Sequence, residues 1–84
     1  MRLERLDEPV KVRADFQGGE ASPILIKRKA QELRVARVTA RWEDRRGAHK
    51  VHYFSVQVAS GDVYQLEFDT GDLLWKLHSV MLDG

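Results

Sequence analysis

The stretch RVTARWEDRRGAHKVHYFSVQV, residues 37–58, decides the fold, because apolar and polar side chains alternate on both sides of a charged turn. Alternation with a period of two places all the apolar side chains of a β-strand on one face. The turn DRRGAHK, residues 44–50, is polar and contains one glycine. We therefore predict a β-hairpin here. The residues predicted to point inward are Ala36, Val38, Ala40 and Trp42 before the turn, and Phe54, Val56 and Val58 after it.

The C-terminal part continues this pattern through two more short turns, SGD at residues 60–62 and DTGD at residues 69–72. Between them VYQLEFD alternates strictly, and short glycine-containing turns of this kind join antiparallel strands. The last strand is predicted in LLWKLHSVML, residues 73–82. The predicted inward residues are Tyr64, Leu66 and Phe68 in the first of these strands, and Leu73, Trp75, Leu77 and Ser79 in the second.

The N-terminal part contains a strand in PVKVRADF, residues 9–16. QGGEAS, residues 17–22, follows, and its paired glycines supply the positive φ that a hairpin turn needs. Residues 1–8 are expected to be flexible, at most one frayed helical turn with Leu3 and Leu6 inward that Pro9 ends. The predicted inward residues of the strand are Val10, Val12, Ala14 and Phe16.

The segment SPILIKRKAQELRV, residues 22–35, fits two structures. Its Ser-Pro start could cap and open a helix over residues 22–33. The two β-branched isoleucines favour a strand instead, and the basic run that follows them would stand where a helix N-terminus favours acidic side chains. We predict a short strand over residues 24–28 and a turn around Ala30-Gln31, with the helix as the alternative.

Six predicted antiparallel strands joined by short turns indicate a small all-β domain, a barrel-like sheet of SH3-like or OB-like size. Val35 falls out of phase with the inward set of its strand, so a β-bulge is expected near residues 35–36. If residues 22–33 formed a helix, the fold would be α+β, with that helix covering a flat sheet. All 84 residues are expected to form one domain.

The composition is that of a globular chain, with 43% apolar and 32% charged residues. The sequence has no cysteine, which excludes disulfides, thiolate zinc sites and cysteine nucleophiles. Small secreted domains usually depend on disulfides, so we expect a soluble, cytoplasmic protein. No apolar stretch has the length of a signal peptide core or a membrane span, and we expect no membrane association.

No residue pattern in the chain is typical of catalysis or of cofactor binding. His49 and His52 point to opposite faces of a strand, so they are not expected to share a metal ion. The glycines punctuate turns and form no phosphate-binding loop, and no serine stands in a nucleophile elbow. We therefore expect a non-enzymatic protein without a cofactor or a metal ion.

Charge is distributed unevenly along the chain. Residues 1–50 contain 13 of the 14 Lys and Arg residues, whereas residues 51–84 contain five acidic residues and one basic residue, Lys76. If the basic residues share one surface, they form a basic patch. If the acidic half pairs beside them in an antiparallel sheet, cross-strand ion pairs cancel it.

The polar face of the central hairpin is the candidate binding face. Arg37, Arg41 and Tyr53 are predicted on it, and a ring beside arginines can stack a base while the arginines hold phosphates. The same face could instead contact a protein partner. The complete candidate set is Arg37, Arg41, Tyr53, Arg45, Arg46, Lys50, Lys27, Arg28 and Lys29.

Four groups of residues form a pattern of aromatic and turn positions: Trp42 followed by two acidic residues, the run Tyr53-Phe54-Ser55-Val56, Asp62 with Tyr64 and Leu66, and Trp75 with Leu77. This pattern resembles a small bacterial β-domain family of unknown function. The same segments, over roughly residues 35–80, also resemble the C-terminal appendix of inactive Y-family polymerase relatives in mutagenic DNA repair. The resemblance implies an association with DNA-related proteins and implies no activity.

The predicted function is that of a binding or accessory module that docks a protein partner. The alternative is a nucleic-acid-binding accessory domain, associated with DNA repair, that uses the basic strand face. Phosphate binding would weaken steeply with salt, whereas docking through an apolar surface or a strand edge would not.

Overall fold

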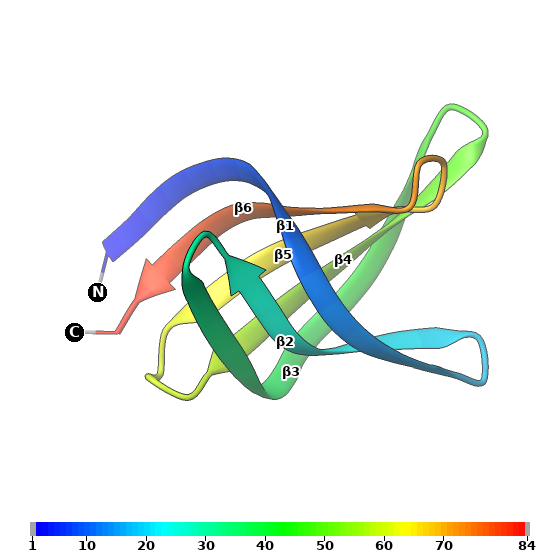
Figure 1. Ribbon diagram of the computed structural model, residues 1–84. Coiled ribbons are helices and arrows are strands. Elements are labelled where there is room, and N and C mark those ends of the chain that lie inside the picture. The colour runs from blue at the N-terminus through cyan, green and yellow to red at the C-terminus, as the bar shows by residue number, and fades with distance from the viewer. Residues whose placement is uncertain (1, 84) are drawn as a thin grey trace.

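The computed structural model describes residues 2–83 and shows six antiparallel strands, with no helix in that range (Figure 1). Each strand pairs with the next one along the chain, and the first pairs with the last, so the sheet closes into a barrel-like ring. This confirms the predicted all-β class and the six strands. The strands are β1 (Arg2–Gln17), β2 (Glu20–Arg28), β3 (Gln31–Arg46), β4 (His49–Val58), β5 (Val63–Asp69) and β6 (Leu74–Leu82).

Strand β2 decides between the two structures expected for residues 22–33, and the helix is wrong. The segment up to Arg28 is extended and pairs with β1, and the chain turns at residues 29–30, one residue before the turn predicted around Ala30-Gln31. Pro23 is tolerated because this part of β2 pairs with β1 alone and lies at a register shift, where a missing N–H disturbs no second ladder. The side chain of Ile26, in this strand, is fully buried in the core.

The expected frayed helical turn at the N-terminus is also wrong, because residues 2–8 belong to β1 and pair with β6. A register shift between Arg5 and Glu8, with Asp7 at a φ of 46°, bends the strand here. Leu6 packs against the core as expected, whereas Leu3 is 58% exposed. Met1 lies outside the described residues.

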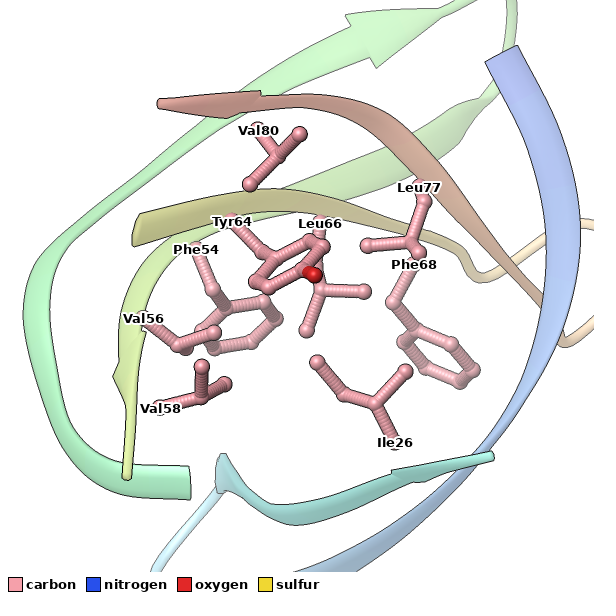
Figure 2. Close-up of a cluster of buried hydrophobic side chains, with 9 residues drawn as sticks. All are labelled: Ile26, Phe54, Val56, Val58, Tyr64, Leu66, Phe68, Leu77 and Val80. Atoms are coloured by element: carbon pink, nitrogen blue, oxygen red, sulfur yellow. The ribbon is translucent and has the colours of Figure 1, made fainter. Parts of the chain in front are cut away.

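The core fills the inside of the ring, where side chains from β2, β4, β5 and β6 converge (Figure 2). Strict alternation in β4 and β5 predicted correctly the six residues of these strands that belong to the buried cluster. Val51, which the alternation places on the opposite face of β4, is also buried, at 1% exposure. Val10, Val12, Val35 and Val38, from β1 and β3, are half-buried around this centre. The buried cluster is Ile26, Phe54, Val56, Val58, Tyr64, Leu66, Phe68, Leu77 and Val80.

Two β-bulges in β3 change which of its side chains point toward the core. One register shift lies between Val35 and Arg37, which confirms the bulge expected near residues 35–36, and a second lies between Val38 and Ala40. Beyond the second shift Arg41 pairs with Phe54 on the inner face and Trp42 is turned outward. The prediction that Trp42 belongs to the core is therefore wrong, and its side chain is 43% exposed.

Other residues predicted to point inward do not do so where a strand ends or where its register shifts. Leu73 lies in the turn before β6, with a φ of 61°, and is 68% exposed. A shift between Gln65 and Leu66 gives the inward position near the end of β6 to Val80 instead of Ser79. Phe16 is 66% exposed because it lies beyond the point at which β1 leaves the ring. Ala36 and Ala40 are exposed, and Trp75 packs against the core as expected.

The ring is closed at one end and split at the other. In the described part of the chain, β2 pairs with β3 only where residues 25–28 face residues 31–34. From Val35 to Arg46, β3 pairs with β4 alone, and residues 20–24 of β2 pair with β1 alone. The β1–β2 hairpin, cyan in Figure 1, therefore projects away from the green and orange hairpins as a separate arm. No helix among residues 2–83 is long and apolar enough to cross a membrane.

Candidate docking cleft

The split between the two hairpins forms a cleft with a volume of about 240 Å³. Residues 19–21 of the β1–β2 arm form one wall, and residues 41–43 of β3 form the other. His52 and Phe54 of β4 form the floor. Both walls are strand segments that pair on one side only, so each directs part of its backbone N–H and C=O groups toward the cleft.

One side chain crosses this cleft. The guanidinium of Arg41 donates to the carbonyl oxygen of Ala21 at 2.6 Å and to the hydroxyl of Ser22 at 3.0 Å. The same group lies 5.6 Å from the centroid of the Phe54 ring, within cation–π distance. A side chain bridges the walls here because the backbones of β2 and β3 are farther apart than the roughly 4.8 Å of paired strands.

The rest of the lining combines charge with the exposed ring of Trp42. Trp42 stacks on Tyr53 with ring centroids 5.6 Å apart and an interplanar angle of 10°. The carboxylate of Glu43 forms an ion pair with Lys50 at 3.8 Å and lies 3.5 Å from Nδ1 of His52. No group of three or more His, Cys, Asp or Glu side chains that could hold a metal ion occurs among residues 2–83. Edge backbone, a floor that contains the Phe54 ring, and mixed charges suit a polypeptide better than a metal ion or a small anion.

The predicted face of the central hairpin is divided between two surfaces. Arg37 donates to the side-chain oxygen of Gln57 at 3.0 Å on the outer face, where Tyr53 also lies. Arg41 lies on the inner face, in the cleft, because of the second bulge in β3. The structure thus brings Arg37 and Tyr53 to one face and separates Arg41 from them.

The basic turn of the same hairpin is largely paired with carboxylates. Arg46 donates to Glu67 at 3.0 and 3.2 Å and to Asp69 at 3.1 Å. Hydrogen bonds from Arg46 lower the pKa of Glu67, although burial of that carboxylate opposes the shift. Lys50 contacts Glu43, whereas Arg45 stands directly opposite Lys50 in the ladder and forms no ion pair within residues 2–83.

The predicted basic run at residues 27–29 points in different directions. Lys27 lies outward and contacts Glu32 at 3.5 Å. Arg28 turns inward and is hydrogen-bonded to Glu8, which raises the pKa of Arg28. Arg28 and Glu8 lie near the buried hydroxyl of Tyr64, and burial raises the pKa of that hydroxyl. Lys29 occupies the turn, with a φ of 55°.

Sequence reasoning missed both the cleft and the cations of the β1–β2 arm. Lys11 and Arg13 were predicted outward, yet only the pairing of β1 with β2 shows that Lys11 stands directly opposite Lys27. No sequence motif marks the cleft, because its position depends on where the β2–β3 ladder ends. The available hint of an irregular edge was Pro23, because a proline within a strand is found at edges and bulges.

Comparison with protein-family models, with curated proteins and with solved structures gives no match to this chain.

Proposed function

We propose that the protein is a non-enzymatic binding module that docks an extended segment of a protein partner in the cleft between β2 and β3. The observation that carries the proposal is the pair of one-sided strand segments, residues 20–24 and 35–46, that face each other across the cleft. An added strand would hydrogen-bond to one or both edges, as in β-strand addition. The resemblance to DNA-associated domains remains a prediction.

The lining supports a polypeptide occupant. A strand places alternate side chains on opposite sides, so one set would meet Phe54 on the floor and the other would meet the exposed Trp42. Exposed aromatic rings of this kind are enriched at protein interfaces. Arg41 would have to leave Ala21 for a strand to bind along β2, and it could then contact an acidic side chain of the partner.

A nucleic-acid partner at the originally predicted hairpin face has weaker support. Arg46 and Lys50 contact carboxylates there, which reduces the charge available to phosphates. Arg41 is directed into the cleft instead of toward Tyr53. The absence of cysteine suits a reducing compartment, so we place the docking role in the cytoplasm.

A peptide selection tests this function. Random peptides of about 10 residues, long enough for one strand, are displayed on phage and selected on the immobilised protein. A second selection uses Ala21→Trp, in which the added ring fills the cleft. The control is Ala48→Trp, at an exposed turn outside the cleft.

We expect enriched peptides whose binding is lost with Ala21→Trp and kept with Ala48→Trp. In NMR spectra of the labelled protein, the shifts should concentrate on residues 20–24 and 36–46. Circular dichroism must show both variants folded. Failure to enrich any peptide, or enrichment of peptides that bind Ala21→Trp equally well, would refute strand docking in this cleft.

A further inference from the structure

A second surface, separate from the cleft, lies on the β1–β2 arm and is strongly basic. A groove of about 410 Å³ includes the cations Lys11, Arg13 and Lys27 in its lining, together with the rings of Phe16 and Trp75. An adjoining groove of about 430 Å³ shares Lys11 and Lys27 and adds Lys29. No acidic residue of the described range lines either groove. We define these four cations and two rings as the arm groove.

The charges of the arm groove are not balanced within the domain. Lys11 and Lys27 are directly opposite in the β1–β2 ladder, an arrangement of like charges that destabilises a sheet. Lys27 has one carboxylate partner, the exposed Glu32. Within residues 2–83, Lys11, Arg13 and Lys29 form no ion pair. An anionic occupant would relieve this repulsion.

The aromatic rings restrict the kind of anion. Phe16 is 66% exposed, and its ring lies edge-on to Phe68 at 6.2 Å. Trp75 is half-buried and held by Phe68 at 4.6 Å, so it lines the groove as a rigid ring. Flat rings beside a row of cations are the features with which proteins bind single-stranded nucleic acids, by stacking the bases and neutralising the phosphates.

We propose that the arm groove binds single-stranded nucleic acid without sequence preference. Lys11 and Arg13 project from the same side of β1 about 6.7 Å apart along the strand, and Lys27 adds a second row from β2. The cations follow the backbone, while Phe16 and Trp75 receive bases. An acidic peptide would use the same cations and would have no need of the two rings.

The test is fluorescence anisotropy with a labelled oligothymidylate of about 12 nucleotides, within the usual site size of such proteins. It is carried out at about 50 mM and 200 mM salt. The double variant Lys11→Gln/Lys27→Gln removes two groove cations. The matched control Arg2→Gln/Arg34→Gln removes two exposed cations outside the grooves. A second measurement uses Trp42→Phe, in which Trp75 is the only tryptophan.

Binding should weaken about tenfold in the groove variant, and the slope of log affinity against log salt should fall by about 1.4, since each phosphate contact on a single strand contributes about 0.7. The control should change less than about twofold. Oligothymidylate should quench Trp75 emission in Trp42→Phe. Equal losses in both double variants, absence of quenching, or tighter binding of an oligoglutamate of equal charge would each overturn the proposal.

Discussion

Glu67 shows how a single residue gives the outer face of this small sheet a second packed region. This residue is 3% exposed although its side chain points away from the barrel core. Arg46 donates to it twice, and Nε2 of His78 lies 2.6 Å from it. The Tyr53 ring packs edge-on against His78 at 5.8 Å. A buried charge is stable only with such partners, so this region links β3, β4, β5 and β6.

The lowered pKa of Glu67 predicts how stability depends on pH. A carboxyl whose pKa is lower in the folded state contributes stability above its ordinary value of 4.5, and this stability is lost as the pH falls through the folded value. Urea unfolding between about pH 3 and 7 should therefore show a fall in the free energy of unfolding on the acid side. In Glu67→Gln this fall should be smaller than in the exposed control Glu4→Gln. Identical profiles for the two variants would contradict this role of Glu67.

Core packing predicts a contrast between two leucines. Leu66 is fully buried at the centre of the cluster, so Leu66→Ala should lower the free energy of unfolding by about 3 kcal/mol through lost burial and a cavity. Leu74 is 61% exposed, and Leu74→Ala should change the free energy of unfolding by less than about 0.5 kcal/mol. Chemical denaturation measures both. Similar losses in the two variants would show that the core is placed wrongly.

Sequence alternation was sufficient where a strand keeps its phase. Phe54 and Leu66 were placed correctly because β4 and β5 pair continuously with each other. Trp42 was placed wrongly because apolar character does not distinguish a core ring from one that stacks on Tyr53 outside. A period of two carries no information on a bulge formed by polar residues such as Thr39, whose hydroxyl donates to the Ser55 carbonyl at 3.0 Å.

At the scale of elements, the second bulge of β3 has the largest consequence. It turns Arg41 inward, where its guanidinium joins the β1–β2 arm to the rest of the barrel through Ala21 and Ser22. Residues 11–24 of the arm pair with no strand outside their own hairpin in the described part of the chain, so this link replaces a missing ladder. The position of Arg41 could not be predicted, because it depends on a one-residue change of register.

Removal of this link should loosen the arm and leave the core intact. In Arg41→Ala, the backbone order parameters of residues 14–22 should fall from about 0.85 toward about 0.6 in ¹⁵N relaxation measurements. Residues 54–58 of β4 should keep their values. Arg37→Ala, which loses only a surface bond to Gln57, is the matched control. An arm that stays equally ordered in Arg41→Ala would show that the guanidinium does not hold it.

At the scale of the molecule, closure of the barrel depends on its two ends. Residues 2–10 of β1 pair with residues 75–82 of β6, and Glu8 contacts Arg28 of the neighbouring strand β2. The hairpins and the barrel-like sheet were predictable from turn residues and alternation, whereas the strand at residues 2–8 that helps to close the ring was not. The segment before Pro9 has a weak pattern, and its strand exists because β6 offers an edge to it.

Deletion of residues 2–8 should therefore cause a large loss of stability. The deletion exposes the β6 edge, removes Leu6 from the core margin and leaves Arg28 without Glu8. For a domain of this size, whose total stability is about 5–15 kcal/mol, this should abolish cooperative thermal unfolding measured by circular dichroism. Leu3→Ala, at a 58% exposed position, should keep the transition of the full chain. An unchanged midpoint after the deletion would show that β1 does not close the barrel.

The docking cleft is also a property of the whole molecule. Its walls come from β2 and β3, and its floor comes from β4. The candidate site could not be found from sequence, since residues 20–24 and 35–46 read as ordinary strands, and their free edges appear only when the end of the β2–β3 ladder is known. The basic residues that the sequence did identify are spread over several surfaces.

Residue-by-residue hydrogen exchange, with and without a peptide selected as above, is the most direct test of strand docking. In the free protein, alternate amides of residues 36–46 should exchange fast, because β4 protects only those that face it. When the peptide is bound, the fast amides on at least one wall, residues 20–24 or 36–46, should become protected. Protection gained only elsewhere, or none at all on either wall, would contradict a docked strand.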